Sequence, residues 1–126
     1  MTYITGFLLA VPEANKAAYI KMAEGAWEIM RDHGCLALQE NWGVDVPDGK
    51  VTSFPMAVQK KEGEAVVFSW MEWPDKETCD RGQAAMIKDP RMAEFAEMPF
   101  DGIRMMWGGF EELIRLSGSP KAESTK

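Results

Sequence analysis

Side chains that usually ligate metals are scarce in this chain, because its 126 residues include one histidine and two cysteines. A zinc site of the usual type needs about four such ligands, so no metal site is expected. Two separated cysteines also make a disulfide framework or a redox Cys-X-X-Cys motif improbable, and they indicate reduced thiols. His33 lies two positions before Cys35, at the end of a predicted helix, where a partial positive charge is favoured. We therefore interpret His33 as structural.

Long apolar runs and glycine-rich cofactor loops are missing too. No run approaches the ~20 apolar residues of a membrane span, and no basic segment precedes the first apolar run. GxGxxG, Walker-type and GxSxG motifs are absent, so no nucleotide cradle, nucleophile elbow or other cofactor is expected. These absences predict a soluble cytoplasmic protein that does not engage membranes.

Basic residues are outnumbered by acidic residues, and the formal net charge is −6. Lys60-Lys61 is the only adjacent basic pair, and Glu62 and Glu64 lie beside it. A phosphate backbone would be repelled overall, so nucleic acid is not an expected partner.

Two segments are instead rich in β-branched and aromatic residues on both of their faces. The segment 66–73 reads Val-Val-Phe-Ser-Trp-Met-Glu-Trp and stops at Pro74. The segment 3–11 is likewise apolar at odd and even positions and stops at Pro12. A strand with one wet face should alternate apolar and polar residues. Both segments are therefore predicted to be central strands covered on two sides.

The remaining elements follow from periodicity and from capping residues. Apolar residues at steps of three and four predict a helix from Asn15, as N-cap, to Gly34, as the residue after the helix. Asp75 should cap a second helix that ends near Lys88, and Asp89-Pro90 a short third helix to about Met98. Further strands are expected at 35–43 and 103–113, with 57–59 extending the hairpin before Val66. The connection 44–56 is long enough to suggest a role in function.

This order of elements matches the split βαβ, or ferredoxin-like, βαββαβ unit of the α+β class. Residues 1–116 should form one domain, and the polar tail 117–126 should be disordered. In this topology two helices cover one face of a four-stranded antiparallel sheet. The other face would be an apolar patch too large for a monomer, so a homodimer is predicted.

Isolated polar residues among large apolar ones are the candidate functional groups. Glu72 stands at the end of a mostly apolar strand, where a carboxylate is paired or has a raised pKa. With a raised pKa it can act as a general base; alternatively it pairs with an arginine such as Arg104 or is simply exposed at the strand end. Glu40, on the same strand as Trp42, belongs to the same group of polar residues.

Aromatic density next to isolated charges predicts that a small, partly apolar molecule binds between the sheet and the helices. The residues expected to bind it are Trp42, Phe54, Trp70, Met71, Glu72, Arg104 and Trp107.

Several ordered motifs resemble the bacterial DUF1428 family over about residues 3–114. They are GFLLAVP at 6–12, NWGVDVPDGK at 41–50, FSWMEWP at 68–74, DPRM at 89–92 and MPFDGIRM at 98–105. The resemblance implies a chain of the dimeric α+β barrel superfamily and supplies no activity. Haem-degrading members of that superfamily carry a histidine on the second helix, which this chain lacks, so no haem is expected.

Two other function classes stay open beside ligand binding. Cofactor-independent monooxygenases occur in the same superfamily, so the protein can be a monooxygenase-like or isomerase-like enzyme that uses Glu72 or Asp101 as base. The alternative from a third class is a structural dimer that acts through protein partners. Residue patterns alone do not rank these two.

Overall fold

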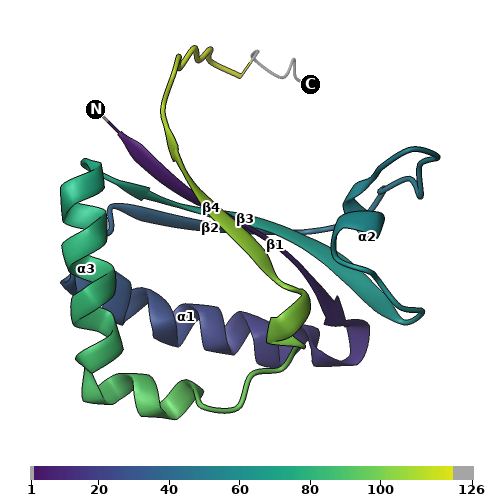
Figure 1. The fold of residues 1–126 in the computed structure, drawn as a ribbon, viewed down its shortest axis with the longest axis horizontal. Coiled ribbons are helices and arrows are strands. Elements are labelled where there is room, and N and C mark those ends of the chain that lie inside the picture. The colour runs from purple at the N-terminus through teal and green to yellow at the C-terminus, as the bar shows by residue number, and fades with distance from the viewer. Residues whose placement is uncertain (1, 121–126) are drawn as a thin grey trace.

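The computed structural model describes residues 2–120 and contains one four-stranded antiparallel sheet with two main helices (Figure 1). The strands pair in the order β2-β3-β1-β4. Their bounds are β1 Tyr3–Pro12, β2 Ala37–Trp42, β3 Glu64–Trp73 and β4 Met106–Glu111. The helices are α1 Lys16–Asp32, α2 Phe54–Ala57 and α3 Lys76–Lys88, with 3-10 turns at Glu13–Asn15, Pro90–Phe95 and Gly102–Arg104. The predicted α+β class and ferredoxin-like order are confirmed, with β1 and β3 in the centre.

The two central strands divide their side chains between the faces as the sequence predicts. On β3 the odd positions Val67, Met71 and Trp73 are buried in clusters on the side of α1 and α3. Leu9 and Val11 of β1 join the same layer, since Leu9 lies opposite Val67 in the register. The even positions of both strands point to the other face. Figure 1 shows α1 and α3 together on the first face.

Helix α1 begins after Asn15 and ends before Gly34, as predicted, but the Asn15 side chain does not cap it. Gly34 follows the helix with a positive φ of 105°, a conformation that glycine adopts without steric cost. Asn15 gives no side-chain cap to the helix; its Nδ2 donates instead to the carbonyl oxygen of Pro99, 2.9 Å away. The Asn15 side chain therefore links the start of α1 to the 90–99 segment by a hydrogen bond.

Capping acids set the positions of α3 and of the segment after it. Asp75 accepts a hydrogen bond from the backbone N–H of Thr78 at 2.7 Å, as predicted. Asp89 accepts one from Arg91 N at 2.9 Å, and the turn that it starts ends at Phe95 rather than near Met98. Asp89 also lies 2.9 Å from His33 Nε2. His33 therefore ties the end of α1 to the end of α3.

The segment 44–58 departs from the prediction. Residues 57–59 do not extend the hairpin, because Ser53 caps the short helix α2 and Gln59 takes a positive φ of 49°. Val58 is fully buried against Ala10 and Val66. The long connection thus folds over one end of the sheet face opposite α1 and α3.

The last strand is shorter than predicted at both ends. Asp101 accepts a hydrogen bond from Ile103 N at 3.1 Å and starts a 3-10 turn where a strand was expected. The strand proper ends at Glu111. The backbone of β4 packs closely against the Tyr3 side chain at Gly109, since a Cβ there would collide with the Tyr3 ring.

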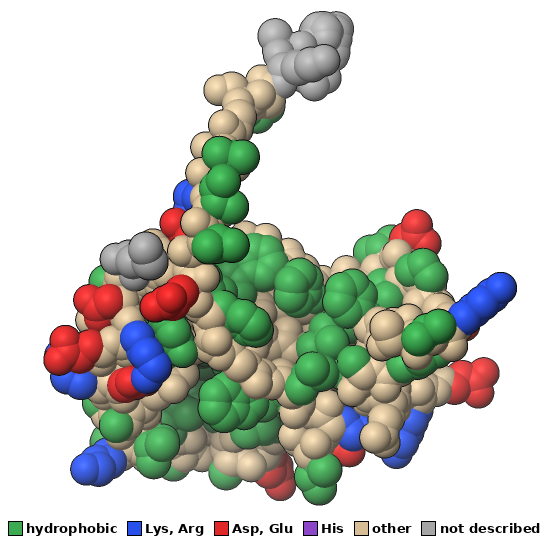
Figure 2. All heavy atoms as spheres, turned by 45° about the horizontal axis from the view of Figure 1, so that its top comes forward, with side chains coloured by type: hydrophobic (Ala, Val, Ile, Leu, Met, Phe, Trp, Pro, Cys, Tyr) green, Lys and Arg blue, Asp and Glu red, His purple; other side chains and the backbone are tan. Residues whose placement is uncertain are grey.

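Much of the sheet face away from α1 and α3, here called the open face, is apolar and uncovered. Phe68, Met106 and Phe110 are each about half exposed there. Figure 2 shows hydrophobic side chains gathered on this face. Within residues 2–120 no helix combines the length and apolarity that a membrane crossing requires.

Gly82→Ala tests the packing of α3 on the sheet. An added Cβ would lie 2.8 Å from the Trp73 ring and would collide with the carbonyl oxygen of His33. Helix propensity alone would make alanine stabilising by about 0.5–1 kcal/mol, whereas overpacking costs about 1–3 kcal/mol. We expect net destabilisation in urea unfolding. Gly102→Ala, which meets open space, is the control, and a stabilised Gly82→Ala variant would contradict this packing.

Candidate functional site

The residues predicted to bind a ligand lie on both sides of the sheet. Trp42 and Met71 pack in the layer beneath α1 and α3. Phe54 and Trp70 lie on the open face, where each contacts the Phe68 ring at centroid distances of 5.9 and 5.4 Å. Residues on opposite faces of one sheet cannot line a single pocket. The predicted set is therefore not one site.

The other predicted residues occupy the periphery. Trp107 is exposed on the edge strand β4, opposite Phe7. Glu72 accepts a hydrogen bond from Arg115 Nη2 at 3.3 Å. The proposed ion pair of Glu72 is present, but its partner is Arg115 rather than Arg104.

Arg104 is held elsewhere, in an ion-pair cluster at the other end of the sheet. Its guanidinium donates to both carboxylate oxygens of Glu64, at 2.8 and 2.7 Å, and to Asp101 Oδ2 at 3.0 Å. The Arg104 and Glu64 side chains are only 11% and 8% exposed. Hydrogen bonds from Arg104, with help from Lys61 N, lower the pKa of Glu64 to about 2. Arg104 likewise lowers the pKa of Asp101, which makes Asp101 a weak base.

A different group of polar side chains meets in the cleft between α1 and the edge strand β2. Tyr19 of α1 donates its hydroxyl proton to Glu40 Oε1 at 2.8 Å. Ser69 lies directly opposite Glu40 in the β2–β3 register, and its hydroxyl lowers the pKa of Glu40. Tyr19 and Ser69 are buried, whereas Glu40 is exposed at the cleft mouth. Three elements thus direct polar atoms to one point.

The pKa values of this group move in the direction opposite to that of Glu64. Loss of surrounding water to neighbouring side chains raises the pKa of Glu40, although the hydrogen bond from Tyr19 and the nearby Ser69 hydroxyl act against this rise. Burial, and then the charge of Glu40, raise the pKa of Tyr19 far above its usual value. No arginine or lysine hydrogen-bonds to the Glu40 carboxylate among the described residues. Glu40 is therefore a carboxylate without a cationic partner.

Apolar side chains form the walls of this cleft. They are Ile20, Ala23 and Trp27 of α1 and Leu38 of β2, and the cavity that they enclose with Tyr19, Glu24 and Glu40 measures about 430 Å³. Such a volume is within the range of small-molecule sites. Beyond it, Lys16 Nζ stands 5.1 Å from the Trp42 ring centroid.

The cleft can accept hydrogen bonds from a bound hydroxyl or amine and bury an apolar body beside them. A carboxylate with a raised pKa is also a better proton acceptor than a free one. For residues 2–120, no group of three or more histidine, cysteine or acidic side chains is arranged to hold a metal ion.

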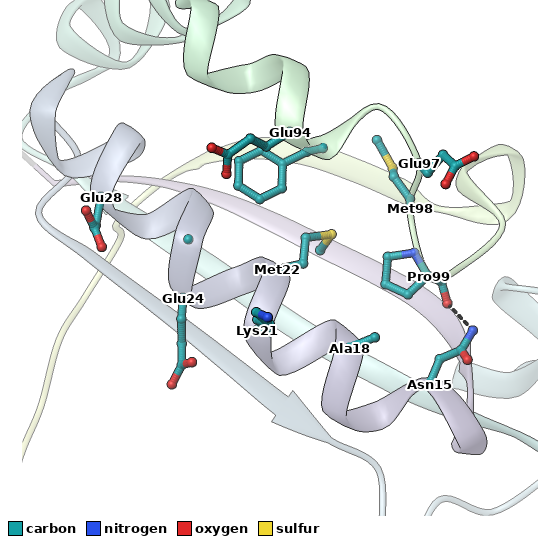
Figure 3. Close-up of a pocket in the computed structure, with 12 residues that line it drawn as sticks. Asn15, Ala18, Lys21, Met22, Glu24, Glu28, Glu94, Glu97, Met98 and Pro99 are labelled. Atoms are coloured by element: carbon teal, nitrogen blue, oxygen red, sulfur yellow. Dashed lines mark hydrogen bonds between the residues drawn. The ribbon is translucent and has the colours of Figure 1, made fainter.

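A larger groove of about 700 Å³ runs between α1 and the 90–99 segment. Figure 3 shows Met22 directed into the space between the two segments, while the carboxylates of Glu24, Glu28 and Glu97 project outward. The Asn15–Pro99 hydrogen bond closes one end. Because its acids face water, this groove offers no converging polar groups.

Sequence reasoning singled out Glu40 as a polar residue but did not connect it with Tyr19. The available signal was parity, since Leu36, Leu38, Glu40 and Trp42 share one face of the strand. Tyr19 recurs with the apolar residues of its helix at steps of three and four, which indicates only that it faces inward. The partner of the Tyr19 hydroxyl can be identified only from the position of α1 against β2 in the folded structure.

Comparison with known proteins identifies the family. The model of a family described as a protein of unknown function, DUF1428, matches residues 2–102. The chain belongs to the DUF1428 family. Uncharacterized protein YbaA of Escherichia coli K12 is 53% identical over 115 residues, which cover 90% of this chain and 98% of YbaA. Uncharacterized protein YbaA of Shigella flexneri matches to the same extent.

A solved structure supports the fold of this DUF1428 protein. It is described as a dimeric ferredoxin-like protein from an uncultured marine organism, and it aligns with a TM-score of 0.56 at 12% identity. The alignment covers 92% of this chain and all of the other. At this identity the likeness extends to the fold alone.

The Arg104–Glu64 pair predicts a specific acid sensitivity. The pKa of Glu64 falls from 4.5 to about 2 on folding, so the unfolded chain binds the proton more readily and the pair's contribution is lost as pH falls through that window. Glu64→Gln should lower stability at pH 7 and flatten the loss of stability below pH 4.5, measured by urea unfolding. Glu62→Gln, an exposed neighbour, is the control. Equal acid sensitivity in the two variants would refute the assignment.

Proposed function

We propose that this DUF1428 protein is a homodimer that binds a small, partly apolar molecule in the cleft between α1 and β2. The observation that carries this proposal is the convergence of Tyr19, Glu40 and Ser69 on one point of an apolar cleft. Glu40 is exposed and receives no hydrogen bond from a lysine or arginine among the described residues. Its carboxylate is therefore open to a donor group supplied by a ligand.

The chemistry of the cleft defines the ligand class. A hydroxyl or amine donor would meet the carboxylate of Glu40, since an ionised carboxylate only accepts hydrogen bonds. A compact apolar or aromatic body would lie against Ile20, Trp27 and Leu38. An anionic ligand is disfavoured because Glu24 also borders the cleft. The expected ligand is therefore neutral or cationic.

The open face supports the dimer. Phe68, Met106, Phe110 and Phe54 expose apolar surface around a hollow of about 200 Å³ there. Exposed apolar surface of this kind usually marks an interaction site. The structural relative that is described as dimeric gives independent support for a second copy as the partner. Two buried, unbridged thiols, Cys35 and Cys79, fit a cytoplasmic location.

A second candidate function is proton-transfer catalysis at the same cleft, of the isomerase or cofactor-independent monooxygenase type. The observation that favours it is the raised pKa of Glu40 next to a buried tyrosine hydroxyl. Glu40 is a better candidate base than Glu72 or Asp101, because arginines pair with both of those acids. The cleft, rather than the sheet end, is where a substrate would be sought.

The neutral probe 4-propylphenol, which carries one hydroxyl donor on an apolar body, should bind in the cleft. We expect titration to shift the indole N–H resonance of Trp27 in preference to those of the other tryptophans. Glu40→Gln should weaken binding at least about tenfold, because a hydrogen bond to a charged group contributes about 1.5–3 kcal/mol.

Glu28→Gln, which removes a carboxylate on the same helix outside the cleft, should bind the probe like the unmodified protein. Equal affinity in the Glu40→Gln and Glu28→Gln variants, or shifts confined to Trp70 and Trp107, would contradict the assignment of the cleft.

The stability of Glu40→Gln distinguishes a binding residue from a structural one. Because the pKa of Glu40 is raised on folding, the folded state holds its proton more tightly and loses stability as pH rises past the ordinary glutamate range. The variant, whose amide oxygen can still accept from Tyr19, should match or exceed the parent in thermal stability at pH 7. The gain should vanish near pH 4. A marked loss at pH 7 would assign Glu40 a structural role.

Phe68→Asp should dissociate the dimer, because it places a charge in the centre of the open face. Ile87→Asp, at a more exposed position on α3, changes an apolar residue in the helix layer and should leave assembly intact. Sedimentation velocity of the two variants measures the difference. A dimeric Phe68→Asp protein would show that the open face is not the interface.

A further inference from the structure

The segment after β4 forms an apolar arm, residues 112–116, that extends away from its own domain. Leu113, Ile114 and Leu116 are 96%, 70% and 84% exposed. Figure 1 shows this arm rising from the end of β4, and Figure 2 shows hydrophobic side chains along it. Three large apolar side chains in sequence, all in water, need a surface to cover them.

Hydrogen bonds fix the direction in which the arm leaves the sheet. Glu112 N donates to Thr2 O at 3.0 Å. Arg115 donates to Glu112 Oε1 at 2.9 Å and to Glu72 Oε1 at 3.3 Å. The arm is therefore held at the Tyr3 end of β1, and Glu72 serves as one of its anchors.

The open face also contains an empty apolar hollow at its other end. It measures about 500 Å³ and lies between the 46–57 segment and β1, with Leu8, Val46, Pro47, Phe54 and Ala57 among its lining residues. One molecule thus carries an unpartnered apolar arm and an unpartnered apolar hollow.

The arm is directed away from the hollow of its own chain. Strands β1 and β4 are antiparallel, with Ile4 opposite Phe110 and Leu8 opposite Met106. The chain therefore moves away from Leu8 as β4 proceeds to the arm. Reaching its own hollow would require the arm to reverse at Glu112 and break the bonds to Thr2 and Glu72.

A second copy of the chain would cover both the arm and the hollow. Consider two open faces that meet about a two-fold axis lying between the sheets and perpendicular to β1. The β1 strands of the two copies then run in opposite directions, and the Tyr3 end of one sheet covers the Leu8 end of the other. Because such a contact is isologous, each arm meets the hollow of the other copy. An axis parallel to β1 would instead bring arm against arm and leave both hollows empty.

We propose that the arm of each protomer seats its leucines in the partner's hollow between the 46–57 segment and β1. This inference rests on the dimer proposed above and adds its symmetry axis and the occupant of the hollow. The long 44–58 connection then acts as the receptor for the partner's arm.

Paired cysteine variants test the contact in the full-length protein. Leu116→Cys and Ala57→Cys chains, each with a different affinity tag, would be co-expressed and mildly oxidised. Native Cys35 and Cys79 are buried and stay in place. We expect a disulfide-linked heterodimer in at least tenfold excess over any cross-linked product of either variant alone.

Other products would overturn the proposal in distinguishable ways. Predominant Leu116→Cys homodimers would place arm beside arm. An intrachain bridge in a chain that carries both substitutions would show the arm folded onto its own hollow. A dimer without a cross-link would refute the arm contact alone, whereas a protein that is monomeric before oxidation would refute the proposed dimer itself.

Assembly measurements provide a second readout. Leu113→Asp with Leu116→Asp should raise the dimer dissociation constant at least tenfold, and Ser117→Asp, one residue beyond the arm, should leave it unchanged. Equal dissociation constants would show that the arm lies outside the interface.

Discussion

Two adjacent central strands that are apolar on both faces are the constraint on which the rest of this structure depends. Strands β1 and β3 pair along their whole length. Because alternate residues of a strand point to opposite faces, both faces of this pair must be covered by other parts of the protein or by a partner. Helices α1 and α3 cover one side with clusters around Leu9, Val67 and Trp73. The chain's own cover for the second side is the 44–58 connection, which reaches only the Ala10–Val66 end.

The carboxylates of Glu64 and Glu40 lie in contrasting surroundings. Glu64 is nearly buried and is satisfied by Arg104 and Lys61 N, and its pKa falls as a result. Glu40 receives only neutral donors, and its pKa rises. The first arrangement neutralises a nearly buried charge, whereas the second leaves an exposed carboxylate open to a further donor. This contrast is the reason for locating function at Glu40.

Local sequence signals were sufficient for the elements and insufficient for the site. Proline stops predicted where the central strands end, Asp75 predicted where α3 begins and Gly34 predicted where α1 ends, because these signals act within a few residues. The partner of Arg104 could not be found in this way, since Glu64 is forty residues distant. Arg104 was predicted as a partner of Glu72 because the last strand was expected to begin at 103, whereas β4 begins at Met106 and Arg115, beyond its end, makes the contact. The Tyr19–Glu40 contact depends on the placement of α1 over an edge strand, which no local pattern encodes.

The proposals add to the established family and fold a second copy on the open face and a ligand in the cleft. Native mass spectrometry of the unmodified protein is the most direct test of its central claim, that a second copy covers the open face. A two-chain particle that persists at low micromolar concentration is predicted, and extra mass retained on it would reveal a bound small molecule. A single-chain particle throughout that range would contradict the account.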